Sequence, residues 1–171
     1  MMNFKTKRLE VKPLSDEDRE SVIDLVTDEM VKQTYMLPDF ASREDAIPLF
    51  QRLKTLSQGN DRLVGGIYLN GRFIGFMNEV ESQDKSIELG YAIAPKYHNC
   101  GYCTEALTGA IAYLFQRGFN EVIAGAFEGN DASFRVMIKS GMEKLERQDE
   151  IEYRGNVHRC VYYAKKKNPV D

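Results

Sequence analysis

The feature that most constrains the fold of this chain is a stretch in which a predicted strand passes through a short loop into a long helix. Ser86 to Ile93 is predicted as a strand, and Pro95 ends it because proline has no N–H to give to a ladder. A short loop follows, and apolar residues recur at helical spacing from Gly101 to Gly118. The first amides of a helix have no partner within it, and the helix dipole adds partial positive charge there. The junction therefore predicts a site for phosphate oxygens.

The rest of the chain predicts a sheet with helices packed against it. Asn70-Gly71 is a two-residue hairpin turn, because both residues tolerate positive φ. Apolar positions predict helices that include Val22–Val26 and Ile47–Leu53. The other strands are expected at about Phe4–Val11, Leu63–Leu69, Arg72–Glu81, Val122–Phe127, Lys144–Tyr153 and Val157–Ala164, with a short helix at Asn130–Ser140. The order βαα–βββ–α–β–α–ββ predicts a mixed α+β fold rather than an alternating doubly wound one.

Composition limits the class of function. The 171 residues carry a net charge of −3, which argues against a nucleic-acid-binding role, since that role requires a basic face. No run of about 18 apolar residues occurs, so we expect no membrane span. Three cysteines are too few and odd in number for a disulfide framework, which favours a cytoplasmic protein. We expect one domain over residues 1–171.

The strand-to-helix junction resembles the acetyl-CoA signature of the GNAT superfamily of N-acetyltransferases. That signature reads Gln or Arg, two residues, Gly, one residue, then Gly or Ala, and its defined positions here hold His98, Gly101 and Cys103. The run Gly-Tyr-Cys-Thr-Glu-Ala from Gly101 closely resembles one in the Rim-type branch, which acetylates N-terminal amines of ribosomal proteins. His98 and Cys103 depart from the signature, but donation from the backbone needs no particular side chain. Further runs resemble that branch's opening strand, second motif and terminal hairpin: Lys5–Leu9, Asn130–Gly141 and Tyr153–His158.

The resemblance implies a GNAT-type fold, a mostly antiparallel twisted sheet with helices on both faces, and acetyl-CoA as the cofactor. The pantetheine arm is expected to pair with the strand end in the manner of an added strand. The diphosphate is expected on the loop backbone, and an asparagine is expected to reach the cofactor from the next helix. The implied cofactor-binding residues are Ala92, Ile93, Asn99, Cys100, Gly101, Tyr102, Cys103, Thr104 and Asn130.

Two residues are candidates for the proton transfers that the resemblance implies. Glu88 matches the Glu of a Glu-x-Gly-Tyr run in that branch, and a base is needed because an amine must lose a proton before it attacks. Ser133, three positions after Asn130, is the candidate acid, because it matches the donor that this branch uses as an alternative. Many relatives instead have a tyrosine at the position of Met137, which cannot donate. Both residues have plain structural alternatives, a solvent-facing strand residue and a first-turn helix residue. Proximity alone can also supply much of the acceleration.

Other functions stay open at this level. Cys100-x-x-Cys103 is compatible with a redox or half-zinc site, but no second pair exists and we expect no metal. A non-catalytic acyl-CoA-binding or sensing module would keep the Gly101 loop without the chemistry. For an enzyme, the acceptor is an amine, either a small molecule or a protein N-terminus. We expect no nucleic-acid or membrane partner, and a monomer or homodimer.

Overall fold

The computed structural model describes residues 1–168, and the chain alternates between two units. Unit 1 comprises Met1–Asn78 and Tyr91–Ala106, and unit 2 comprises Glu79–Gly90 and the residues from Leu107 onward. The boundaries cut through two strands and one helix, and each unit is described by itself. The last three residues of the predicted 1–171 domain lie outside the described residues, and the single-domain interpretation stays a prediction.

Unit 1 begins with two short strands where the sequence predicts one. β1 (Phe4–Lys5) and β2 (Leu9–Lys12) run antiparallel, with Phe4 opposite Val11, so the prediction of a single strand from Phe4 to Val11 is wrong. Thr6 forms the reversal: its N–H donates to the Leu9 carbonyl at 2.9 Å, and its Oγ1 accepts from the Leu9 N–H at 3.1 Å. Apolar alternation continues on both sides of so tight a turn, so periodicity alone does not reveal it.

The sheet of unit 1 continues through a hairpin. β2 pairs with β3 (Val64–Leu69), and β3 pairs with β4 (Arg72–Gln83), both antiparallel. The predicted turn at Asn70-Gly71 is confirmed, since these two residues have φ of 50° and 77°. The strand order in this unit is therefore sequential, β1-β2-β3-β4.

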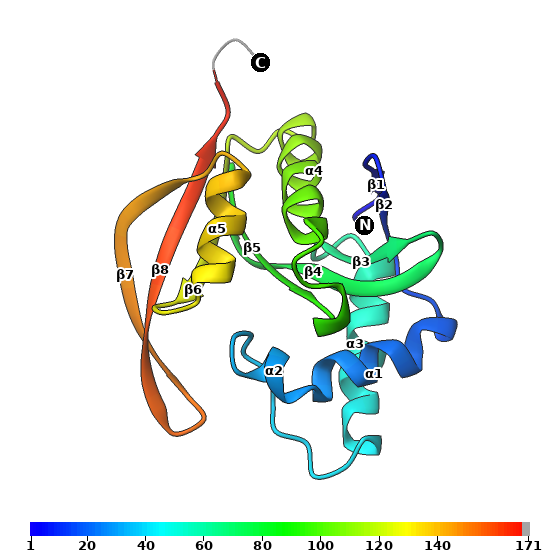
Figure 1. The fold of residues 1–171 in the computed structure, drawn as a ribbon. Helices are drawn as coiled ribbons and strands as arrows, with labels where there is room; N and C mark the ends of the chain where they lie inside the picture. The colour runs from blue at the N-terminus through cyan, green and yellow to red at the C-terminus, as the bar shows by residue number, and fades with distance from the viewer. Residues whose placement is uncertain (169–171) are drawn as a thin grey trace. The chain divides into compact units, whose positions relative to one another are not determined.

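Helices bury their apolar faces against these strands. α1 (Arg19–Thr27) and α3 (Ile47–Gln58) cross beside each other (Figure 1), and their buried residues join those of β3 and β4 in one core. The short helix α2 (Glu29–Lys32) has no counterpart among the predicted elements. Asp28 initiates it by accepting from the amides of Met30 and Val31 at 2.9 and 3.1 Å. Single turns of 3-10 helix complete the unit: η1 (Asp16–Asp18), η2 (Glu44–Ala46) and η3 (Pro95–Tyr97).

Unit 2 contains a parallel strand pair. β5 (Ser86–Ile93) lies parallel to β6 (Glu121–Phe127), with Glu88 opposite Ile123. Parallel neighbours need a long crossover connection, and α4 (Tyr102–Gln116) supplies it. Residues predicted for the apolar face of that helix are buried, among them Leu107, Ala110 and Leu114.

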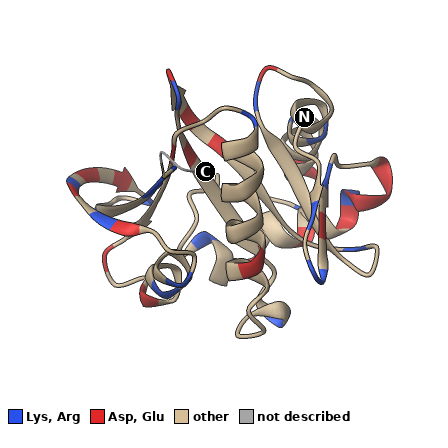
Figure 2. Cartoon of the chain, turned by 90° about the horizontal axis from the view of Figure 1, so that it is seen from above, with Lys and Arg blue, Asp and Glu red and all other residues tan. Residues whose placement is uncertain are grey.

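A long antiparallel hairpin completes unit 2. β8 (Asn156–Lys166) pairs with β6 on one side and with β7 (Glu143–Tyr153) on the other, giving the order β5-β6-β8-β7, and α5 (Asp131–Lys139) connects β6 to β7. Charged residues of both signs occur along this hairpin (Figure 2). The predicted mixed α+β fold with a mostly antiparallel sheet is confirmed. No helix within residues 1–168 is long and apolar enough to cross a bilayer.

Candidate active site

The predicted phosphate loop lies in unit 1, between β5 and α4. Backbone hydrogen bonds fix its first residues: the Ala94 N–H donates to the carbonyl of Ile74 on β4 at 2.8 Å, and the His98 N–H donates to the Pro95 carbonyl at 3.0 Å. The His98 ring nitrogen Nε2 lies 2.8 Å from the Ile93 carbonyl oxygen. His98, which departs from the family signature, thus closes the loop on itself.

Two residues of the loop adopt left-handed backbone conformations before the helix begins. Asn99 and Gly101 have φ of 61° and 76°, the left-handed region that favours Asn and Gly. The Glu105 N–H donates to the Gly101 carbonyl at 3.0 Å as the first turn of α4 closes, so the amides of residues 102–104 precede the helix's own ladder. Left-handed residues beside a helix start can turn successive amides toward one side, which makes an anion-binding concavity. The geometry fits a diphosphate bound by the backbone.

A carboxylate ties this loop to the first strands. Glu105 Oε1 accepts from the Thr6 hydroxyl at 2.6 Å and from the Arg8 N–H at 2.7 Å, and Oε2 accepts from Arg8 Nε at 2.6 Å. Burial raises the pKa of the Glu105 carboxyl, but the hydrogen bonds from Thr6 and Arg8 outweigh it and hold that pKa below its ordinary value. The Arg8 guanidinium also donates to the Cys100 carbonyl at 3.1 Å and lies 4.5 Å from the centre of the Tyr102 ring. The same arginine thus orders both sides of Gly101.

The two loop cysteines are not bonded to each other. Cys100 is exposed, whereas Cys103 is half-buried, and burial raises the pKa of its thiol to about 12. A redox thiol needs the opposite shift, because the thiolate is the reactive form. Within the described residues, no three His, Cys, Asp or Glu side chains are grouped in a way that could hold a metal ion.

Ala92 and Ile93, predicted to meet the pantetheine arm, lie at the buried end of β5. Gly75 of β4 approaches them so closely that a Cβ there would lie 2.2 Å from the Ala92 carbonyl oxygen. Only glycine permits that approach.

The predicted base, Glu88, lies in unit 2 on β5 and is 12% exposed. Its Oε2 lies 3.3 Å from Nη1 of Arg147 on β7. Burial raises the pKa of the Glu88 carboxyl, and Arg147 opposes that rise without cancelling it. A carboxylate with a raised pKa is a stronger proton acceptor than an exposed one.

The predicted acid and cofactor-binding asparagine lie together at the start of α5. Asn130 is the N-cap, and its Oδ1 accepts from the Ser133 N–H at 3.2 Å. Met137, one helical turn beyond Ser133, is fully buried, so the position of the missing tyrosine belongs to the core. His158 in the last hairpin stacks on Phe127 at 4.5 Å, in keeping with a structural role.

Within each unit the structure brings together residues that the sequence leaves far apart. In unit 1 the loop residues 99–104 meet Arg8 and Glu105, whose pairing the sequence analysis missed because they lie 97 positions apart. In unit 2 Glu88 meets Arg147, a partner that was not predicted from the sequence. No local signal identifies Arg147, because it is one charge among many on a charged strand.

Comparison with known proteins identifies a family model that matches most of the chain. The profile of the acetyltransferase (GNAT) domain matches residues 8–143. Among curated proteins, the uncharacterized N-acetyltransferase YoaA of Bacillus subtilis is 27% identical over 147 residues, which cover 82% of each chain.

Solved structures share the fold. An acetyltransferase (GNAT family) from Bacillus anthracis superposes with a TM-score of 0.83 at 24% identity, covering 96% of this chain and 98% of that one. RimL, a ribosomal L7/L12 alpha-N-protein acetyltransferase solved in complex with coenzyme A, superposes with a TM-score of 0.79 at 18% identity, covering 94% and 95%.

Proposed function

Because the chain belongs to the acetyltransferase (GNAT) domain family, whose reaction moves an acetyl group from acetyl-CoA to an amine, we propose that it acetylates a primary amine with Glu88 as the base. The observation that carries the proposal is the loop at residues 99–104. Its left-handed residues and helix start offer backbone donors for a diphosphate, whatever side chains replace the usual signature.

For acetyl-CoA we propose the same binding residues that the sequence resemblance implies. Residues 99–104 bind the diphosphate through their amides, Ala92 and Ile93 present the strand end to the pantetheine arm, and Asn130 lies at the start of α5. Bound acetyl-CoA supplies the thioester carbonyl that the amine attacks and the thiolate that leaves.

Glu88 prepares the amine. An alkylammonium group has an ordinary pKa of about 8 at an α-amine and about 10.4 at a lysine, so it must lose a proton before its lone pair can attack. The Glu88 carboxylate accepts that proton, directly or through one water molecule. Its raised pKa narrows the gap to the ammonium and makes the transfer less uphill.

Ser133 is the proposed acid. Its hydroxyl gives a proton to the departing sulfur and regains one from solvent, while the Asn130 cap fixes the backbone that carries it. The buried thioether of Met137 cannot take this role.

The acceptor is proposed as a primary amine of a protein N-terminus or a small molecule. The motif runs of the Rim-type branch and the fold shared with RimL support protein N-termini as the first acceptors to test. A monomer or homodimer remains our expectation.

One assay tests the proposal. The protein is incubated with acetyl-CoA and a panel of N-terminal peptides and small amines, and free thiol is followed while acetyl-CoA binding is measured by calorimetry. We expect binding, together with thiol release that depends on one class of amine. Binding without release across the panel would instead support the sensing module, and absence of binding would overturn the assignment of the loop.

A further inference from the structure

An irregularity in β7 lies beside Glu88. Lys144 of β7 pairs with Tyr163 of β8, but the next pair is Gln148 with Val161, so residues 145–147 of β7 stand opposite Tyr162 alone. An insertion of this kind bends the strand and redirects its side chains, and such bulges are frequent next to active sites. Here it turns Arg147 onto the Tyr162 ring.

The Arg147 guanidinium lies over the aromatic ring of Tyr162. Its Cζ is 3.9 Å from the centre of the Tyr162 ring, and that ring is 3% exposed. Tyr162 in turn lies against Gly125 of β6, where a Cβ would come within 2.6 Å of the ring. The cation thus rests on an aromatic face that is fixed by the sheet, which removes much of the freedom of a long side chain.

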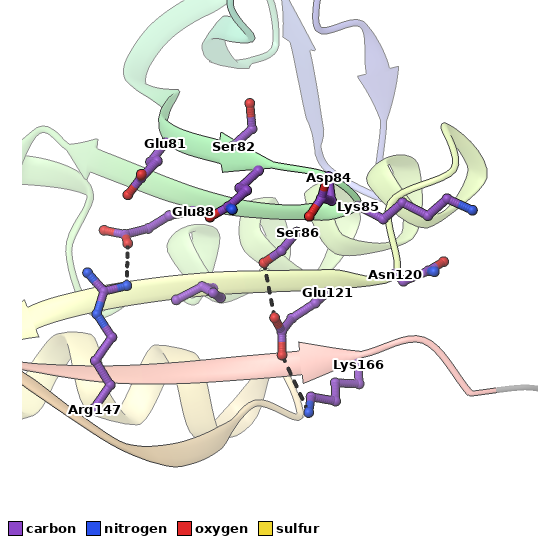
Figure 3. A pocket seen from close by; sticks show the side chains of 12 residues that line it. Glu81, Ser82, Asp84, Lys85, Ser86, Glu88, Asn120, Glu121, Arg147 and Lys166 are labelled. Atoms are coloured by element: carbon purple, nitrogen blue, oxygen red, sulfur yellow. Dashed lines mark hydrogen bonds and ion pairs between the residues drawn. The ribbon is translucent and has the colours of Figure 1, made fainter.

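The fork of the guanidinium divides between two carboxylates. Its Nε and Nη2 donate to Asp149 Oδ2 at 3.0 and 2.8 Å, while Nη1 donates to Glu88 Oε2 at 3.3 Å (Figure 3 shows the Glu88 contact). Arg147 and Asp149 are each 42% exposed, whereas Glu88 is 12% exposed. Arg147 therefore bridges an exposed aspartate and a largely buried glutamate.

Glu88 and Arg147 share one groove. It has a volume of about 650 Å³ and is lined by residues of β4, β5, β6, β7 and β8, including Glu81, Ile123 and Lys166. Figure 3 shows Arg147 reaching across to Glu88 from the opposite side of this groove. A small molecule or a peptide end that enters the groove reaches the Glu88 carboxylate beside the arginine.

We propose that Arg147 is a positioning residue, which holds the Glu88 carboxylate in one orientation for proton transfer and is itself fixed by Asp149, the Tyr162 ring and the β7 bulge. This inference rests on the proposed role of Glu88 as the base. An ordinary surface ion pair contributes little to stability and needs neither a bulge nor an aromatic support. We therefore infer that the arrangement serves to orient the Glu88 carboxylate rather than to stabilise the fold.

The charges around Glu88 make the proposal testable by pH. Burial raises the pKa of its carboxyl, and Glu81 of β4 and Asp149 of β7 act in the same direction. Cys160 and Tyr162 of β8 also face this charge, since the Glu88 carboxylate raises the pKa of each. Arg147 is the cation that opposes these effects, so removing its charge moves the titration of Glu88 to higher pH.

The experiment compares wild type with Arg147→Gln, Arg147→Lys and the control Arg159→Gln. Arg159 lies on the same hairpin and pairs with Glu128 at 3.7 Å, away from Glu88. The side-chain carboxyl of Glu88 is titrated by carbon NMR in protein labelled at glutamate, with Glu88→Gln to assign its signal. Thiol release is measured over the same pH range.

In Arg147→Gln we expect the Glu88 carboxyl to titrate at higher pH than in wild type and the acidic limb of the pH–rate profile to shift by the same amount. We expect kcat to fall roughly tenfold and the KM for acetyl-CoA to stay unchanged. Arg147→Lys should restore much of the titration but less of kcat, because an ammonium lacks the planar fork. Arg159→Gln should match wild type in both. If Arg147→Gln does not fold, Asp149→Asn, which releases the outer side of the fork, should lower kcat in the same direction.

Two outcomes overturn the inference: an unchanged Glu88 titration in Arg147→Gln, or a shifted titration with wild-type kcat and pH profile. The proposed function fails in a different way, by absence of thiol release from wild type with every amine. The two failures are therefore distinct.

Discussion

At the scale of single residues, two carboxyl groups have pKa values shifted in opposite directions: the pKa of Glu105 is lowered and that of Glu88 is raised. Glu105 accepts three hydrogen bonds from Thr6 and Arg8, and these bonds favour its charged form. Glu88 lies beside the cation Arg147, but burial has the larger effect on its pKa and disfavours its charged form. The first arrangement suits a structural anchor, and the second suits a group that exchanges protons.

Glu105→Gln should weaken the fold in a pH-dependent manner. Because the pKa of this carboxyl is lower in the folded protein, its stabilisation is present above the ordinary value of 4.5 and is lost as pH falls through the folded pKa. We expect a loss of about 1–3 kcal/mol in the free energy of unfolding at pH 7, and a smaller difference from wild type at pH 3.5. Urea denaturation at both pH values measures it, with the exposed Glu152→Gln as control. A difference that does not change with pH would contradict the anchor.

Glu88→Gln should lower turnover without affecting the cofactor. Loss of a general base costs roughly 10²-fold or more in kcat, while the backbone loop that binds acetyl-CoA is unchanged. We expect the calorimetric Kd for acetyl-CoA to stay within about twofold, and the acidic limb of the pH–rate profile to disappear. Wild-type turnover with an unchanged profile would remove Glu88 from the mechanism.

At the scale of elements, the predictions are most accurate where local chemistry decides the conformation. The hairpin at Asn70-Gly71 follows from residues that tolerate positive φ, and the helix starting at Tyr102 follows from apolar spacing after Gly101. The single first strand is wrong because the reversal depends on one threonine side chain. The β7 bulge has no local signature, since three residues opposite Tyr162 are visible only once the partner strand is known.

Gly75→Ala tests the contact between β4 and the end of β5. A Cβ at Gly75 would lie 2.2 Å from the Ala92 carbonyl oxygen and 2.9 Å from the Ile93 Cα, so backbone must move. We expect a loss of about 3 kcal/mol or more in the free energy of unfolding. Gly59→Ala is the matched control: its Cβ would meet no atom closer than 3.5 Å and its φ is −88°, so we expect a change within about 1 kcal/mol. Equal effects of the two substitutions would show that the approach is not tight.

At the scale of the whole molecule, ligand binding should couple to unfolding. A ligand that binds only the folded chain at 100 times its Kd adds about 2.7 kcal/mol, which for a chain of this size raises Tm by roughly 5–10 °C. We expect acetyl-CoA to produce such a shift in a thermal melt.

Gly101→Glu is the control for that melt. A carboxylate at this left-handed position adds both backbone strain and negative charge where a diphosphate is expected, so the shift should vanish. A shift of wild-type size in Gly101→Glu would place acetyl-CoA elsewhere.

The sequence by itself predicted most of the order of elements, because turn residues and helix starts are local properties of the chain, but it predicted neither the reversal at Thr6 nor the helix α2. The phosphate loop and the roles of Glu88 and Ser133 follow from motif spacing and resemblance, and they stay predictions. Only the tertiary structure decided that Glu105 anchors Arg8, that the Asn130 side chain caps α5, and that Arg147 holds Glu88. The pairings of Glu105 and Glu88 join residues 97 and 59 positions apart, and burial sets the protonation of each carboxylate against the charge beside it. Neither distance nor burial is a local property, so neither could be obtained from the order of residues alone.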